Sequence, residues 1–245
     1  MVMNHMVQLM KQLSGKVGSS IYSSVSNQGN PHHVSFLRQM EKEVKQQKDV
    51  LEQPLDKLNV IVFDLETTGF YPDQGDKVLS IGAVKVNGDV IDECDCFYSL
   101  VHANVNVDPR ISELTGITTA DLKTAPSLQQ VLGEFYRYIE GQVLVAHHAN
   151  HEKSFMQHAT WSVRRKNFQH RIIDTSFLTR LFQTSERLVS LDECCSYFGI
   201  ATNGRHHALH DAKMTAELWR ASVKKVQDLG YQTLNDIYVQ LAKMR

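Results

Sequence analysis

Cysteine is scarce in this sequence, and its spacing argues against structural zinc. The chain of 245 residues has four cysteines, Cys94 and Cys96 in one segment and Cys194 and Cys195 in another. Neither pair has C-x-x-C spacing, and adjacent cysteines rarely bond to each other. Cys94 and Cys96 are expected on one face of a strand. We therefore predict four reduced thiols, as in proteins of a reducing compartment.

The sequence also lacks an excess of one charge and a long apolar run. Its 26 Lys and Arg against 27 Asp and Glu give a formal net charge of -1, so no strong basic field marks a general nucleic-acid binder. An enzyme that holds one strand end at a metal site needs no such field. No apolar run approaches the roughly 18 residues of a membrane span, and the first residues lack the positive start of a signal peptide. These absences predict a cytoplasmic protein without a membrane partner.

Residues 1–56 differ in composition from the rest of the chain. Apolar residues recur at helical intervals near the start and again over residues 31–51, with a stretch rich in Ser and Gly between them. Helical spacing around a Ser/Gly-rich connection predicts a helical arm with a loose linker. We expect this arm to pack on the main domain or on a partner protein.

Residues 57–230 carry the pattern of one α/β domain. Near-continuous apolar runs over residues 58–66 and 142–147 predict strands that are covered on both faces. Asn87-Gly88 predicts a hairpin between two further strands. Antiparallel strands followed by alternating strands and helices predict a mixed sheet flanked by helices.

The sequence predicts where some of the later helices begin and end and which of their faces is apolar. Ser190 is predicted to cap a helix that Gly199 ends. A longer helix is predicted over residues 207–230. Its apolar stripe consists of Leu209, Ala212, Ala216, Trp219, Val223 and Val226. Residues 231–245 are predicted to form a terminal helix that packs on the domain.

Two carboxylates, Asp64 and Glu66, end the most hydrophobic strand. Residues two apart share one face of a strand, so both side chains project from its C-terminal edge, where open α/β sheets gather binding sites. Two like charges at this spacing are costly unless a cation or a proton lies between them. An exposed strand end would also explain either acid alone. The pair is followed at once by Thr67-Thr68-Gly69, however, and carboxylate oxygens suit Mg²⁺ or Mn²⁺.

Two further acids stand among histidines. The two groups are His147, His148, His151 with Glu152, and His206, His207, His210 with Asp211. If Asn150 caps the helix that follows, Glu152 lies in its first turn, and Asp211 is predicted on the polar flank of the long helix near its start. Each acid therefore has a simpler explanation, because the positive end of a helix dipole favours an anion. An imidazole suits proton transfer near pH 7, and spacing alone places His207 on the helical face of Asp211.

Three segments together resemble a known family. In order and spacing, "FDLETTG", "VAHHANHEKSFM" and "HHALHDA" are similar to the three motifs of the DnaQ-like (DEDDh) 3′–5′ exonucleases, which include the proofreading epsilon subunit of bacterial DNA polymerase III and RNase T. The resemblance covers roughly residues 58–221. It implies an RNase H-like fold and release of nucleoside monophosphates from 3′ ends of single-stranded DNA or RNA, with polymerase-associated proofreading as one setting.

The resemblance also implies roles for individual residues. The implied ligands of two divalent cations, Mg²⁺ or Mn²⁺, are Asp64, Glu66, Glu152 and Asp211. The implied general base is His206, which stands five residues before Asp211. The implied substrate contacts are Thr67, Thr68, Gly69, Leu114 and His151.

The second segment departs from the family's usual H-N-A-x-F-D. His148 replaces the Asn, His151 the Phe and Glu152 the Asp, so the charge is kept on a side chain that is one methylene longer. This departure supports an alternative, a catalytically weakened nucleic-acid-binding or polymerase-associated module on the same fold. The N-terminal arm is the expected contact for a DNA polymerase or another protein.

Overall fold

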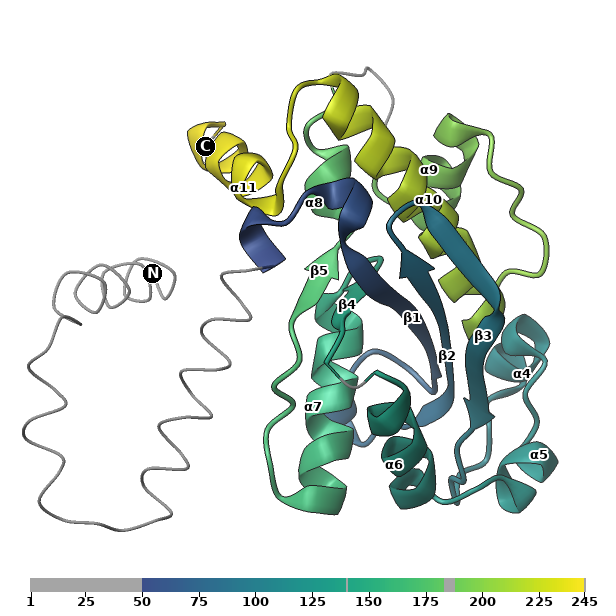
Figure 1. Cartoon of the computed structure of the whole chain (residues 1–245). Helices are drawn as coiled ribbons and strands as arrows, with labels where there is room; N and C mark the ends of the chain where they lie inside the picture. Colours follow the sequence, from purple (N-terminus) through teal and green to yellow (C-terminus); the bar gives the residue numbers. More distant parts are fainter. Residues whose placement is uncertain (1–49, 140, 183–187, 245) are drawn as a thin grey trace, which may run out of the picture. The chain divides into compact units, whose positions relative to one another are not determined.

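A five-stranded sheet is the centre of the computed structural model, which describes residues 50–139, 141–182 and 188–244 (Figure 1). The strands are β1 Asn59–Thr67, β2 Val78–Asn87, β3 Val90–Leu100, β4 Val143–Ala146 and β5 Ile172–Asp174. Their order is β3-β2-β1-β4-β5, with β1 antiparallel to β2 and parallel to β4. The predicted mixed sheet and the hairpin at Asn87-Gly88 are confirmed. Of residues 1–56, for which a helical arm and linker are predicted, residues 1–49 lie outside the described residues.

Helices connect and cover the strands. They are η1 Leu55–Lys57, η2 Pro72–Gln74, α4 Pro109–Thr115, α5 Thr119–Thr124, α6 Leu128–Tyr138, α7 Asn150–Arg164, α8 Ser176–Thr179, α9 Leu191–Phe198, α10 Ala208–Asp228 and α11 Leu234–Lys243. The ends of α9 are as predicted: the Ser190 side chain accepts from the backbone N–H of Glu193, and Gly199 has the left-handed φ of 66°. In the predicted stripe of α10, all residues but Leu209 are buried.

The two faces of the sheet are covered by different helices (Figure 1). Ile61, Phe63 and Leu65 of β1 pack in one core cluster with Phe135 of α6 and Phe155 of α7. Each such buried side chain contributes roughly 1.5–3 kcal/mol to folding. Side chains alternate along a strand, so the even-numbered residues of β1 face the other way, where α10 packs on β1, β2 and β3. Asp64 and Glu66 therefore project toward α10.

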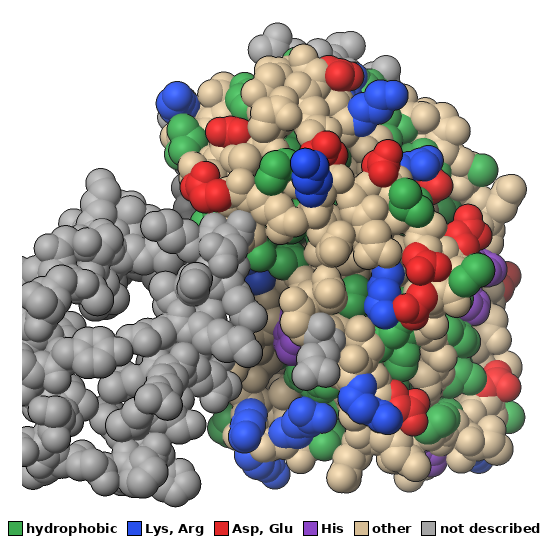
Figure 2. All heavy atoms as spheres, in the orientation of Figure 1, with side chains coloured by type: hydrophobic (Ala, Val, Ile, Leu, Met, Phe, Trp, Pro, Cys, Tyr) green, Lys and Arg blue, Asp and Glu red, His purple; other side chains and the backbone are tan. Residues whose placement is uncertain are grey.

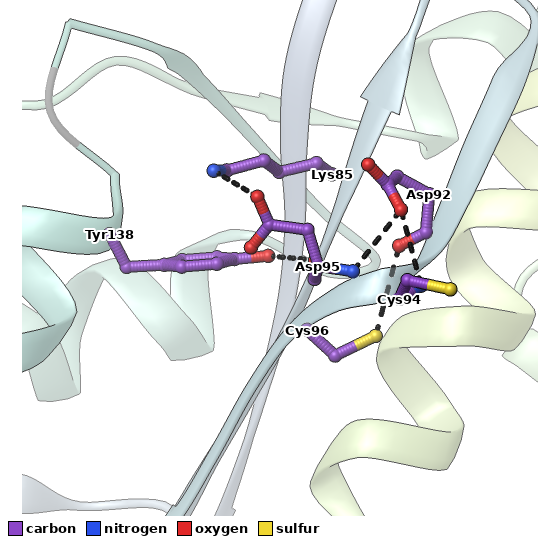
Figure 3. A network of polar contacts seen from close by, with 6 residues as sticks. All are labelled: Lys85, Asp92, Cys94, Asp95, Cys96 and Tyr138. Carbon is purple, nitrogen blue, oxygen red and sulfur yellow. Dashed lines mark hydrogen bonds and ion pairs between the residues drawn. The ribbon is translucent and has the colours of Figure 1, made fainter.

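The edge strand β3 is interrupted by a bulge (Figure 3). Cys96 pairs with Val84 and Asp92 with Lys85, so three residues of β3 lie between two consecutive residues of β2. The Asp92 carboxylate closes the bulge by accepting from the backbone N–H groups of Cys94 and Asp95, each at 3.1 Å. The bulge therefore interrupts the regular alternation of side chains on which the expected shared face of Cys94 and Cys96 depends. All four cysteines carry free thiols, as predicted.

The segment that leads into α11 contacts the segment that leads into β1. Pro54 pairs with Thr233, and the Leu55 N–H donates to the Gln232 carbonyl at 2.9 Å. Leu234 of α11 is buried. Among the described residues, no helix has the length and apolarity that crossing a membrane requires. Figure 2 shows Lys and Arg side chains interspersed with Asp and Glu over one face, in keeping with the balanced charge.

Candidate active site

The residues predicted from the sequence come together in one cavity of about 1100 Å³. It opens where β1 and β4 end and where α7 and α10 begin. The predicted residues in its lining are Asp64, Glu66, Thr67, Thr68, Gly69, Leu114, His151, Glu152, His206 and Asp211. Carboxyl ends of neighbouring strands and the first turns of two helices thus form one cavity, at the edge where binding sites of α/β sheets generally lie.

Three of the four predicted acids converge within this cavity. Asp64, Glu66 and Asp211 each offer a carboxylate oxygen, and these oxygens lie within 4.8 Å of one another. Glu152 lines the same cavity and acts on Asp64 electrostatically, but it stands outside that group of three. Asp211 is only 4% exposed, so its predicted place on a polar flank is wrong. The first turn of α10 faces the sheet because the helix begins directly over it.

Gly82 allows that close approach, and sequence reasoning missed it. It pairs with Asp64 across the β1–β2 ladder. A Cβ at this position would stand 2.2 Å from the Ala208 carbonyl carbon and from the Leu209 nitrogen. The backbone at the start of α10 therefore occupies the volume that any other side chain would fill, and this contact brings Asp211 against Asp64 and Glu66.

The carboxylates of the cavity are enclosed and repel one another. Burial, followed by the charges of Glu152, Glu66 and Asp211, raises the pKa of Asp64 well above its usual value. Burial raises the pKa of Glu66 to about 7, with Asp211 adding to the effect. Burial raises the pKa of Glu152 to about 8, with a further contribution from Asp174. Ionised acids in this arrangement require a compensating positive charge.

Two buried oxygens are available to supply ligands. Within the part of the chain that the structure describes, Asp211 Oδ1 and Glu152 Oε2 are buried without a hydrogen-bond partner. Oxygen ligands from several carboxylates are the set that Mg²⁺ and Mn²⁺ prefer. The residues present therefore fit a hard divalent cation, and the absence of thiol ligands in this group argues against a soft one.

The histidines before α10 have distinct places. His206 lines the cavity, has a left-handed φ of 64°, and donates its backbone N–H to Asp211 Oδ2 at 3.2 Å. His207 precedes the first residue of α10 and stacks on Tyr98, with ring centroids 4.5 Å apart. His210 is exposed and lies 3.3 Å from the Gly204 carbonyl. The helical spacing that pointed to His207 is misleading because His207 lies outside the helix, with extended backbone.

The second motif is held by an acid that the sequence did not single out. Asp174 of β5 accepts from the Ala149 N–H at 3.1 Å and from the Ser176 N–H at 2.9 Å. The position before α7 is Ala149, without a side-chain cap, so the cap considered at Asn150 is absent and Asn150 is the first residue of the helix. Asp174 instead satisfies the N–H of Ala149 from another strand, and Glu152 still lies in the first turn.

The loop after β1 is shaped by its own hydrogen bonds. The Thr68 hydroxyl donates to Asp76 Oδ1 at 3.0 Å, and a Cβ on Gly69 would meet the Asp76 carboxylate at 2.4 Å. The Thr67 hydroxyl donates to the Gly69 carbonyl at 2.7 Å and lies 3.4 Å from His151 Nε2. Thr68 and Gly69 thus hold the loop that lines the cavity against Asp76.

Apolar and aromatic side chains line the cavity beside this loop. Leu114 is 53% exposed and Phe70 is 77% exposed. The Phe70 and His151 rings meet edge to face, with centroids 5.7 Å apart. Exposed apolar surface beside clustered acids is suited to a ligand that has both a flat apolar part and a charged part.

Arg205 is a further important residue that sequence reasoning missed. Its guanidinium lines the cavity and pairs with both Asp192 and Asp211. It directly precedes His206 in "GRHH", but its distance from Asp192 along the chain follows no helical or strand period. No local pattern could have identified the contact.

The chain matches a family model and several named proteins. Residues 61–219 match the family model RNase T, described as Exonuclease. DNA polymerase III subunit epsilon of Aquifex aeolicus is 34% identical over 172 residues, which is 70% of this chain and 82% of that protein. DNA polymerase III PolC-type of Caldanaerobacter subterraneus is 32% identical over 72% of this chain, but this chain spans only 12% of its length.

Solved structures share the fold at lower identity. The nuclease domain of 3'hExo, described as a DEDDh family member bound to rAMP, has a TM-score of 0.59 and 20% identity, covering 69% of this chain and 92% of that one. Exonuclease X in complex with 5′ overhanging duplex DNA has a TM-score of 0.56 and 22% identity, covering 74% and 98%. These similarities confirm the predicted RNase H-like fold.

Proposed function

Because the chain belongs to the RNase T family of exonucleases, we propose that it is a metal-dependent 3′–5′ exonuclease that releases nucleoside monophosphates from single-stranded DNA or RNA ends. The observation that supports this most strongly is the convergence of Asp64, Glu66 and Asp211 in one cavity with His206. The chain spans a small part of its PolC-type relatives, so the substrate and the setting are also part of the proposal.

In this proposal, Asp64, Glu66 and Asp211 hold the divalent cations, and Glu152 contributes Oε2 from the first turn of α7. Two bound Mg²⁺ or Mn²⁺ ions would neutralise these acids, lower the pKa of the attacking water and stabilise charge on the phosphodiester. The acids are carried by β1, α7 and α10, so the packing of these elements fixes their separation before any substrate arrives.

His206 is the proposed general base. It borders the acids, and its backbone N–H is fixed by Asp211. In this position its imidazole would accept the proton from the attacking water as the water adds to phosphorus. The stacked pair of His207 and Tyr98 keeps the neighbouring imidazole out of that role.

The terminal nucleotide would lie along the loop after β1. Thr67, Thr68 and Gly69 would border the sugar and phosphate, while Leu114 and His151 would contact the sugar or base. Choice between DNA and RNA depends on a contact to the 2′-hydroxyl. Because the named relatives are DNA polymerase III proteins, we extend the proposal to proofreading beside a polymerase, with the N-terminal arm as the contact.

Digestion of 5′-labelled oligonucleotides tests the proposal. Single-stranded DNA, RNA and a mismatched duplex are incubated with the protein and Mg²⁺, Mn²⁺ or EDTA. A ladder that shortens from the 3′ end, with mononucleotide products and no products in EDTA, is the expected result. The matched control is Asp64→Asn, which removes one carboxylate charge from the cavity.

The weakened-module alternative predicts a different pattern in the same assay. Oligonucleotides would then bind without being shortened, and Glu152→Asp would restore cleavage by returning the shorter acid. Absence of shortening with both cations, while an epsilon subunit digests the same oligonucleotide, would refute the exonuclease proposal.

A further inference from the structure

Arg205 bridges two acids on different helices. Its Nε donates to Asp192 Oδ1 of α9 at 2.9 Å, and its Nη1 donates to Asp211 Oδ2 of α10. The Arg205 side chain is 21% exposed, and that of Asp192 is 57% exposed. Asp192 does not line the cavity, and among the described residues it is Arg205 that connects its carboxylate to the cavity.

This bridge engages one of the two oxygens of the Asp211 carboxylate. Asp211 Oδ2 accepts from Arg205 and also from the His206 backbone N–H. Oδ1 is left buried with no partner among the described residues. The carboxylate is therefore fixed in rotation, with one oxygen committed to the protein and the other free to bind a cation.

The same bridge flanks His206. A non-glycine residue at φ of 64° is held in a sparsely populated conformation that its surroundings must stabilise. On one side, Arg205 is anchored by the two acids. On the other, His207 is anchored by its stack on Tyr98. Both neighbours of His206 are thus fixed by side-chain contacts outside the segment itself.

We propose that Arg205 is a positioning residue for cation binding and for His206, and that Asp192 acts through it. The inference rests on the proposed function and adds two residues to its site. A planar guanidinium can donate to both acids at once in a fixed geometry, whereas a lysine ammonium is a point charge on a flexible stem. The fork of N–H donors in the guanidinium, and not only its positive charge, orients Asp211 and the His206 backbone.

Three variants separate these contributions. Arg205→Lys keeps the charge and loses the fork, Arg205→Gln loses both, and Asp192→Asn keeps Arg205 but removes its outer anchor. The control is Arg220→Gln, because Arg220 of α10 pairs with Glu217 on the same helix, away from the cavity. Mn²⁺ affinity is measured by electron paramagnetic resonance, and cleavage by kcat and KM.

We expect Arg205→Lys and Arg205→Gln to lose roughly 10–100-fold in both Mn²⁺ affinity and kcat, because supporting partners of metal ligands typically have effects of this size. Asp192→Asn should also lower both the Mn²⁺ affinity and kcat, while KM changes little. Arg220→Gln should match the wild type. Asp192 is exposed, so this variant keeps the test valid even if the Arg205 variants unfold.

Two results would overturn the inference. If Arg205→Lys retained wild-type Mn²⁺ affinity and kcat, the charge alone would be sufficient and the fork would have no role. If Asp192→Asn left both quantities unchanged, Asp192 would not act on the cavity. The Mn²⁺ measurement needs no cleavage, so the two proposals can fail separately. If the wild-type protein cleaved no oligonucleotide while these variants bound Mn²⁺ more weakly than the wild type, the exonuclease proposal would be refuted and this inference would stand.

Discussion

The backbone of Ala208 lies so close to Gly82 that a Cβ on Gly82 would stand 2.2 Å from the Ala208 carbonyl carbon. Gly82 also pairs with Asp64, so this contact sets the distance between the acids of β1 and the acid of α10. The site therefore depends on a residue that has no functional group.

Gly82→Ala should destabilise the protein and disturb cation binding together. Either β2 or α10 must move, and forcing an extra methyl into a packed site typically costs about 1–3 kcal/mol. Urea unfolding measures the loss. Gly133→Ala is the matched control, since nothing lies within 4 Å of its Cβ position in α6, and we expect it to be neutral or to stabilise by up to about 1 kcal/mol. Equal stability of the two variants would contradict the close contact.

His206→Ala should lower the single-turnover cleavage rate by roughly 10²–10⁴-fold, the usual effect of losing a general base. His207→Ala should have a smaller effect, because His207 stacks on Tyr98 and does not line the cavity. A larger loss in His207→Ala than in His206→Ala would show that the third motif has been aligned with the wrong histidine.

Glu152→Gln should separate stability from cation binding. Removing a buried acid whose pKa is raised to about 8 should raise the melting temperature of the metal-free protein above pH 8. The same change removes a charged ligand, so added Mn²⁺ should stabilise the variant less than the wild type. Thermal unfolding with Mn²⁺ and with EDTA measures both effects. A wild-type response to Mn²⁺ would exclude Glu152 from the cation site.

Stability should depend on pH differently with and without a cation. Glu66 and Glu152 have an ordinary pKa of 4.5, raised here to about 7 and about 8 by burial. The folded protein holds these protons more tightly than the unfolded chain does. Their contribution to metal-free stability is therefore present below about pH 4.5 and is lost as the pH rises through 7 and 8.

A divalent cation favours the ionised acids and should cancel that loss. We expect Mg²⁺ to raise the melting temperature over EDTA at about pH 8 by roughly 3–6 °C for each pKa unit that it relieves, and by little at about pH 5.5, since one pKa unit is worth about 1.4 kcal/mol. A series of melting curves at fixed ionic strength measures this. A stabilisation independent of pH would indicate that the cation binds elsewhere.

Local sequence patterns were sufficient to predict most of the fold. The apolar run of β1, the turn at Asn87-Gly88, and the cap and stop of α9 each depend on residues close in sequence, so periodicity and turn chemistry revealed them. The short helices α4 and α5 and the bulge of β3 were not predicted. The bulge depends on a side chain that bonds to the backbone two and three residues later, against the alternation of a strand.

By itself, the sequence determined which residues are the candidates for the proposed chemistry: the strand that ends in Asp64 and Glu66, and the two helices that begin near Glu152 and Asp211. Only the tertiary structure decided how they meet. The space left by Gly82 brings α10 onto the sheet, and the Arg205 bridge selects the free oxygen of Asp211. The physical reason is that periodicity reports which face of an element a residue occupies, whereas a contact between elements depends on volumes and charges far apart in the chain.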